Sequence, residues 1–153
     1  MTVRGTLYTD GGSRGNPGPA GIGIVLLRES GDICCSGGRY LGECTNNIAE
    51  YQALIWGLQT ALACDVTDLV VRCDSELIVK QMRGEYRVKN AGLQPLHARA
   101  KEAARALSSV RYEHVPREQN KRADALANAA MDARRDVGDV SVAGSARDQR
   151  TLF

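Results

Sequence analysis

The 153-residue sequence lacks several features that would indicate other classes of protein. It has no apolar run long enough to cross a membrane, and its first residues do not resemble a signal peptide. It has no C-x-x-C pair and only two histidines, His97 and His114, so we do not expect a zinc site. It also lacks the G-x-x-x-x-G-K-[ST] loop that binds nucleotide phosphates. What remains is a globular protein of ordinary composition, for which we expect no membrane association.

The cysteines and the distribution of charge further limit the class of protein to which this sequence could belong. The five cysteines are odd in number and two of them, Cys34 and Cys35, are adjacent, which fits reduced thiols and predicts a cytoplasmic protein. Residues 1–79 contain five Lys/Arg against nine Asp/Glu, a net charge of −4, whereas residues 80–153 contain fifteen against nine, a net charge of +6. This asymmetry is compatible with a polyanion held beside an acidic centre, and also with ordinary solvated helices.

The hydrophobic pattern predicts an α/β fold with a mixed five-stranded sheet in the order βββαβα(α)βα. Three apolar runs joined by short turns indicate an antiparallel meander, and the later strands connect through helices, which favours parallel pairing. We expect strands at 3–9, 20–27, 33–40, 69–73 and 110–115, and helices at 47–64, 75–83, about 95–108 and 120–135. The domain is expected over residues 1–135, followed by a C-terminal tail, 136–153.

Four carboxylates fall at the ends of these expected elements: Asp10, Glu50, Asp74 and Asp124. Functional sites in open α/β sheets assemble at strand ends, so these side chains could converge. Converging carboxylates repel one another unless they bind protons or cations, and their oxygens suit Mg²⁺ or Mn²⁺. Two such ions about 4 Å apart can flank a phosphodiester.

Each carboxylate also has a purely structural interpretation. Asp10 could be the acidic residue of a hairpin turn, and Asp74 could be the N-cap of the helix that follows it. Glu50 could complete a capping box that begins at Asn47, and Asp124 could be favoured by the positive end of its helix. These interpretations explain the residues singly, but not why all four occupy compatible positions.

Four ordered segments, 8–21, 45–51, 73–75 and 120–128, resemble the signature blocks of type 1 ribonuclease H, and the resemblance spans about residues 3–131. It implies an endonuclease that hydrolyses the RNA strand of RNA–DNA hybrids and leaves 5′-phosphate and 3′-hydroxyl ends. It also implies two Mg²⁺ or Mn²⁺ ions per active site. By position, the catalytic and metal-binding residues are Asp10, Glu50, Asp74 and Asp124.

The resemblance also implies contacts with the substrate. Asn16, Asn46 and Asn47 match residues that contact bases and sugars in the minor groove, where the 2′-hydroxyl of RNA can be reached. Thr45 matches a residue that binds a DNA phosphate. Tyr86 lies near an aromatic residue that supports the DNA strand, although it could simply be a half-buried aromatic of the connector.

The sequence departs from the family pattern before the last carboxylate. The loop at 115–120 is short and lacks the histidine that many members carry there. His114 alternates with Tyr112 on an expected strand, so we interpret it as structural. Arg117 is the better candidate for a cation near the site, with an ordinary solvated arginine as the alternative.

The connector 84–92 is too short for the basic protrusion of some bacterial members, although Arg83, Arg87 and Lys89 could perform a weaker version of its task. We also expect no N-terminal hybrid-binding module, no second domain and no obligatory protein partner, and therefore a compact monomer.

Three other functions agree less well with the sequence. A nucleotide-binding protein is disfavoured because the glycine-rich turn 11–18 leads into a strand rather than a helix. A catalytically silent hybrid-binding module would leave the four carboxylates unexplained. A transposase-like or resolvase-like nuclease of the same superfold is disfavoured by the Thr-Asn-Asn block at 45–47.

Overall fold

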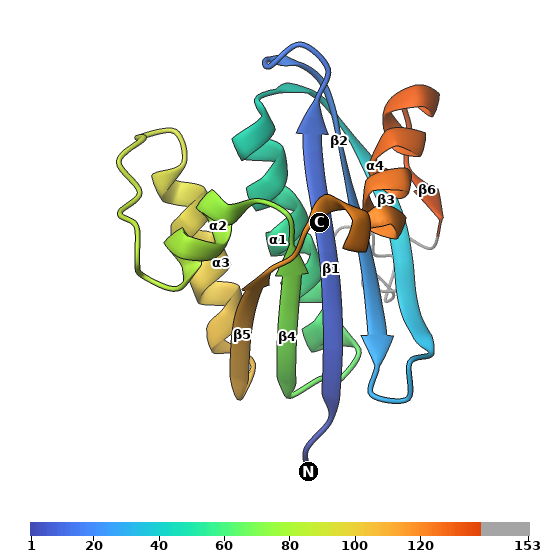
Figure 1. Ribbon diagram of the computed structural model, residues 1–153, viewed down its shortest axis with the longest axis vertical. Helices are drawn as coiled ribbons and strands as arrows, with labels where there is room; N and C mark the ends of the chain where they lie inside the picture. The colour runs from blue at the N-terminus through green and yellow to red at the C-terminus, as the bar shows by residue number, and fades with distance from the viewer. Residues whose placement is uncertain (139–153) are drawn as a thin grey trace.

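The computed structural model describes residues 1–138 and shows an α/β fold (Figure 1). Three long strands form a meander before the first helix, and the later strands are connected through helices, with α2 and α3 in succession between β4 and β5. The elements in chain order are β1 (Arg4–Ser13), β2 (Gly18–Arg28), β3 (Ile33–Cys44), α1 (Asn46–Ala63), β4 (Asp68–Cys73), α2 (Glu76–Met82), α3 (Gln94–Arg105), β5 (Ser109–His114), the 3-10 turn η1 (Arg117–Gln119), α4 (Lys121–Ala133) and β6 (Val137–Gly138).

The strands form one mixed sheet in the order β5-β4-β1-β2-β3-β6, with β1 at its centre. The meander is antiparallel, and β4 and β5 run parallel to β1. The predicted fold is therefore confirmed, but the predicted strand count was one too low. The extra strand, β6, pairs with β3 through only two residues, which is too short to give a sequence pattern. The rest of the expected tail, 139–153, lies outside the described residues.

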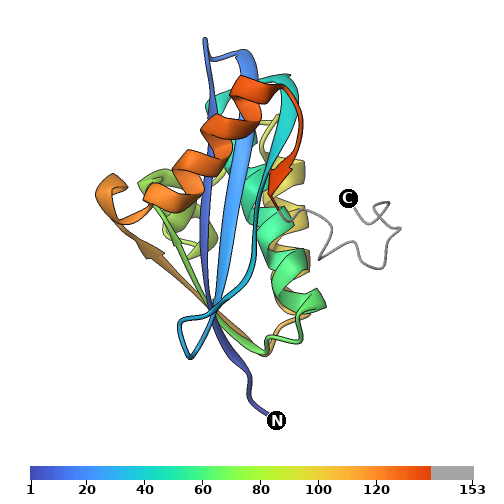
Figure 2. The ribbon, with the colours of Figure 1, turned by 90° about the vertical axis from the view of Figure 1, so that its right-hand side faces the viewer.

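The helices cover both faces of the sheet, with α1 and α3 on one side and α4 on the other (Figure 2). The main core lies between α1 and the sheet, where Leu7, Leu26, Leu54 and Leu58 are almost completely buried. Burial of each such side chain contributes about 1.5–3 kcal/mol, so this layer fixes α1 on the central strands. Among residues 1–138, no helix combines the length and the apolar character needed to cross a membrane.

Strand β1 continues beyond the predicted end at Thr9. It stays paired with β2 as far as Ser13, and Asp10 lies opposite Gly23. The expectation that Asp10 ends its strand was therefore wrong. Gly11 and Gly12 keep the register of the antiparallel ladder instead of turning the chain.

Two glycines allow helices to approach the sheet from opposite faces. A Cβ atom at Gly11 would lie 2.5 Å from the carbonyl carbon and oxygen of Ala49 in α1, and a Cβ atom at Gly23 would clash with the Ala123 carbonyl oxygen in α4. Both helices therefore lie directly against the backbone of the central strands. The next residue of α1 is Glu50, and α4 carries Asp124, so this packing brings both carboxylates toward Asp10.

Candidate active site

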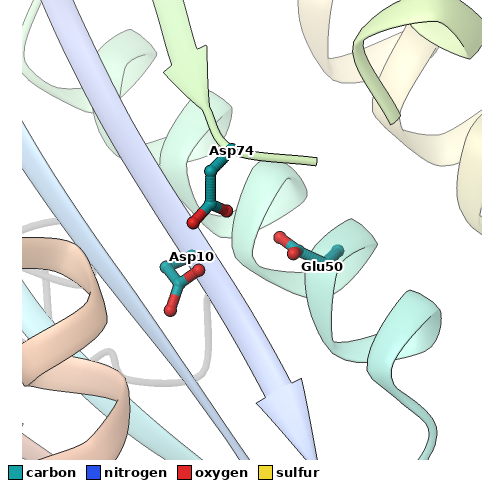
Figure 3. Close-up of side chains that lie close together, drawn as sticks. All are labelled: Asp10, Glu50 and Asp74. Atoms are coloured by element: carbon teal, nitrogen blue, oxygen red, sulfur yellow. The ribbon is translucent and has the colours of Figure 1, made fainter. Parts of the chain in front are cut away.

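Three carboxylates from separate elements meet at one point. One oxygen each of Asp10 in β1, Glu50 in α1 and Asp74 after β4 lie within 4.8 Å of one another (Figure 3). Asp124 from α4 lines the pocket that contains these three carboxylates, and its charge raises the pKa of Asp10. Asp10 is only 8% exposed. The structure thus brings all four predicted carboxylates together, three of them in a tight cluster.

The sheet topology explains this meeting. Strand β4 pairs with β1 only as far as the Tyr8–Arg72 pair, so β1 has a free edge on that side from Thr9 onward. Asp74 follows the end of β4 at this edge. Glu50 belongs to α1 on one face of the sheet and Asp124 to α4 on the other, and both residues line the pocket at this edge.

Three of the structural interpretations of these carboxylates are wrong. Asp10 pairs with Gly23 within the β1–β2 ladder, so it is not a residue of the hairpin turn. The N-cap of α1 is Thr45, whose Oγ1 accepts a hydrogen bond from the Ile48 N–H at 3.3 Å, so Glu50 does not belong to a capping box that begins at Asn47. The N-cap of α2 is Ser75, whose Oγ accepts from the Ile78 N–H at 3.3 Å, so Asp74 is not the cap. Asp124 does lie in the first turn of α4, at its positive end.

Burial and mutual repulsion make the cluster hard to ionise. Burial, followed by the charges of Asp74 and Asp124, raises the pKa of Asp10 to about 8, and Arg117 partly opposes this. Burial and the charges of Asp10 and Asp74 raise the pKa of Glu50 well above its usual value. A cation placed among these oxygens would relieve the repulsion. A donor set made only of carboxylate oxygens fits a hard divalent ion such as Mg²⁺ or Mn²⁺.

Without a divalent cation, the stability of the protein is expected to fall as the pH rises from about 4 to about 8. The folded-state pKa of Asp10 lies above its ordinary value of 3.8, so the folded protein binds more protons than the unfolded chain in this interval. At about 1.4 kcal/mol per pKa unit, we expect a loss on the order of 2–4 kcal/mol by pH 7. Urea unfolding in EDTA across this range measures the loss. An equally steep fall in Asp10→Asn would contradict this assignment.

The predicted substrate-binding asparagines also hold the site together. Asn16 Oδ1, in the β1–β2 turn, accepts from the Asn46 N–H at 2.9 Å, and Asn46 Oδ1 accepts from the Ser13 N–H at 2.7 Å. The turn is thereby fastened to the start of α1. Asn16, Asn46 and Asn47 are all exposed, so each amide is accessible from solvent.

Tyr86 lies in the connector between α2 and α3, and 48% of its surface is exposed. The Nζ of Lys80 lies 5.0 Å from the centre of its ring and 3.5 Å from its hydroxyl oxygen. Tyr86 is not among the residues that line the carboxylate pocket. Its exposed ring and the ammonium group of Lys80 therefore lie outside this pocket.

Arg117 and His114 differ in their relation to the carboxylates. The Nη2 of Arg117 lies 3.5 Å from Oδ1 of Asp124, and Arg117 lines the carboxylate pocket while 78% of its side chain remains exposed. His114 is exposed at the end of β5 and does not line this pocket, so the structure does not support its interpretation as a structural residue. Of these two residues, Arg117 contacts a carboxylate and shares its pocket.

Sequence reasoning missed two supporting asparagines. Asn120 is 1% exposed, and its Nδ2 donates to the Thr9 carbonyl oxygen at 2.8 Å, which ties the start of α4 to β1 beside Asp10. Asn128 Nδ2 donates to the backbone carbonyl oxygen of Asp124 at 3.0 Å and to the side-chain Oδ1 of Asp124 at 3.3 Å. The four-residue spacing from Asp124 to Asn128 on a helix could have revealed this second contact. Nothing in the sequence marks Asn120 as buried.

The protein has a mixed sheet with helices on both faces, and carboxylates gather at the free edge of the central strand. These features define a ribonuclease H-like α/β protein. The family model described as reverse transcriptase-like matches residues 8–130. Ribonuclease HI of Halobacterium salinarum is 45% identical over 125 residues, which are 82% of this chain and 63% of that protein. LC11 ribonuclease H1, whose structure was solved in complex with an RNA/DNA hybrid, is 43% identical with a TM-score of 0.80, and the match covers 85% of this chain and 98% of that one.

This chain belongs to the type 1 ribonuclease H family. It spans less than two thirds of some relatives: a bifunctional protein of Mycobacterium tuberculosis is 45% identical over 128 residues, which are 83% of this chain and 35% of that protein.

Proposed function

We propose that this protein is a metal-dependent endoribonuclease that hydrolyses the RNA strand of RNA–DNA hybrids and leaves 5′-phosphate and 3′-hydroxyl ends. The proposal is carried by the oxygens of Asp10, Glu50 and Asp74 within 4.8 Å of one another, with Asp124 beside them. The similarity to a ribonuclease H1 solved with an RNA/DNA hybrid supports the choice of substrate. Cys34, Cys44, Cys64 and Cys73 are free thiols, which supports a cytoplasmic setting. We also propose a monomer without an obligatory protein partner.

The four carboxylates would hold two Mg²⁺ or Mn²⁺ ions. When bound, such ions supply an activated water and stabilise the leaving oxygen of a phosphodiester. The charges of Asp74 and Asp124 both raise the pKa of Asp10, and we propose that Asp10 shares bound metal ions with these two neighbours. Glu50 belongs to α1, which lies on the face of the sheet opposite α4 and Asp124. We propose that Glu50 also contacts a 2′-hydroxyl of the RNA.

The residues around the cluster would position the hybrid. Asn16, Asn46 and Asn47 are proposed to contact the minor groove, since their exposed amides lie on the β1–β2 turn and at the start of α1. Thr45, at the same helix start, is proposed to bind a DNA phosphate. Tyr86, with its exposed ring, is proposed to support the DNA strand. An A-form minor groove displays 2′-hydroxyls, so contacts there distinguish a hybrid from duplex DNA.

A cleavage assay on four matched substrates tests the proposal. A labelled RNA–DNA hybrid should be cut with Mg²⁺ and left intact with EDTA, whereas the corresponding duplex RNA, duplex DNA and single-stranded RNA should not be cut. Binding should weaken as salt is added, because phosphate contacts release counterions. Binding without cleavage would instead indicate a silent hybrid-binding module, and equal cleavage of duplex DNA would indicate another nuclease of the same superfold.

The contribution of the groove contacts can be measured at Asn47. Asn47→Ala is expected to weaken binding of the hybrid by about 3- to 30-fold, because it removes an amide without breaking a hydrogen bond that supports the fold. Asn16 and Asn46 are less suitable because their side chains also fasten the β1–β2 turn to α1. Fluorescence anisotropy in Ca²⁺ measures the change. An unchanged affinity for hybrid in this variant would contradict the groove assignment.

Arg117→Ala is expected to lower turnover or substrate affinity by about 3- to 10-fold without abolishing the chemistry. Arginine has a permanently charged planar fork that can bind a phosphate, but its pKa is too high for it to shuttle protons at neutral pH. Single-turnover and multiple-turnover rates separate these effects. His114→Ala is the matched control, and we expect neither its rate nor its stability to change much, because its ring is exposed. Loss of single-turnover cleavage in His114→Ala alone would reverse the assignment.

A further inference from the structure

We propose that Asn128 is a positioning residue for Asp124 and that Arg14 connects it to the β1–β2 turn. The inference rests on the proposed function, because it assigns these two residues to the support of a metal-binding carboxylate. Neither residue belongs to the carboxylate cluster, but both line the pocket that contains it.

The contact between Asn128 and Asp124 fixes the direction of the carboxylate. Asn128 Nδ2 lies 3.3 Å from Oδ1 of Asp124 and 3.0 Å from its backbone carbonyl oxygen. Arg117 approaches the same Oδ1 at 3.5 Å. With donors gathered at Oδ1, the carboxylate cannot rotate freely, and its orientation toward Asp10 is held from the side of α4. Hydrogen bonds to ligating carboxylates commonly orient them for the metal.

Arg14 extends this contact to the glycine-rich turn. Its Nη2 donates to Asn128 Oδ1 at 3.1 Å, and its Nη1 lies 2.8 Å from an oxygen of Asp132. The Arg14 backbone N–H donates to the Pro19 carbonyl oxygen at 2.8 Å, so the same residue closes the turn between β1 and β2.

The amide of Asn128 is consequently used at both ends, since its oxygen accepts from Arg14 and its nitrogen donates to Asp124. The same turn carries Asn16, which accepts from the Asn46 N–H. A continuous chain of hydrogen bonds therefore joins the turn that is proposed to contact the hybrid with the fourth carboxylate.

Asn128→Leu tests the positioning role because leucine has a similar shape, favours helices and cannot donate a hydrogen bond. We expect it to weaken Mg²⁺ binding by the free protein by about 10- to 100-fold, measured by calorimetry. The Mg²⁺ concentration for half-maximal cleavage should rise by a similar factor, whereas KM for hybrid at saturating Mg²⁺ should stay within about twofold. Gln59→Leu is the control, because it removes a side-chain amide from α1 outside the pocket and should leave Mg²⁺ binding unchanged.

Arg14→Gln tests the connection independently and does not alter α4. It should weaken Mg²⁺ binding by a smaller factor, about 3- to 10-fold, and the double variant should bind Mg²⁺ no more weakly than Asn128→Leu alone, because Arg14 acts through Asn128. Mg²⁺ affinities within twofold of the parent protein in both single variants would overturn the proposal, as would fully additive effects. Absence of hybrid cleavage by the parent protein would instead overturn the proposed function, since calorimetry measures metal binding without substrate.

Discussion

Asp10→Asn is expected to abolish Mg²⁺-dependent cleavage of an RNA–DNA hybrid, with a loss of roughly 1,000-fold or more. Asp10 is the most buried of the four carboxylates and the one on which the charges of both Asp74 and Asp124 act. The amide has nearly the same volume but no negative charge, so it removes a metal ligand without opening a cavity. Removing residues that only support metal ligands typically costs 10- to 100-fold, and the loss of a ligand should cost more.

The same substitution should stabilise the fold when no metal is present. In EDTA near neutral pH, Asp10 is buried next to two other carboxylates, so either its ionisation or its protonation above its ordinary pKa costs free energy of folding. Asparagine has no ionisable group and removes this cost. Added Mg²⁺ should therefore raise the unfolding temperature of the parent protein and have little effect on Asp10→Asn.

Asp32→Asn is the matched control for Asp10→Asn, since it makes the same chemical change in the exposed turn between β2 and β3. Its activity and its response to Mg²⁺ should equal those of the parent protein. Retained Mg²⁺-dependent cleavage in a folded Asp10→Asn protein would show that the carboxylate cluster is not the catalytic centre.

The sequence was sufficient for the order of the helices and strands from β1 to α4 and for the convergence of the four carboxylates, whose catalytic role stays a prediction. The helical spacing of Leu54 and Leu58 and the apolar run before Asp74 reflect burial on α1 and β4, and burial leaves a periodic pattern. Convergence could be anticipated because each carboxylate occupies a fixed place relative to a strand or helix. The end of β1 was misjudged because Gly11 and Gly12, which usually interrupt strands, here continue one.

The interactions that the sequence did not reveal are those that depend on tertiary structure. Asn120 was visible only as the start of a helix, yet it is buried because its amide reaches the Thr9 carbonyl oxygen 111 residues away. The capping roles of Thr45 and Ser75 were obscured because neighbouring residues also suit an N-cap. The contact of Arg14 with Asn128 joins segments that are 114 residues apart, and no local pattern predicts it.

Gly11→Ala is expected to destabilise the protein by about 3 kcal/mol and to reduce cleavage by about 100-fold. The added Cβ would lie 2.5 Å from the Ala49 carbonyl group and 2.7 Å from the Glu50 backbone nitrogen. Because these contacts are to helix backbone, no flexible side chain can move aside, and α1 must shift away from β1. The shift would carry Glu50 away from Asp10 and Asp74, and a displacement of about 1 Å in an active site can cost 100-fold in rate.

Gly12→Ala is the control for Gly11→Ala, because it places the same methyl group on the adjacent residue. Its Cβ would come no closer than 3.8 Å to a neighbouring atom, Oδ1 of Asn46, so its stability should stay within about 1 kcal/mol of the parent protein. Urea unfolding gives the two free energies, and calorimetry with Mg²⁺ shows whether Gly11→Ala also weakens the metal site. If Gly11→Ala were as stable as Gly12→Ala and bound Mg²⁺ normally, α1 would not depend on this glycine for its position. The close approach of helix and strand would then not be what holds Glu50 beside Asp10.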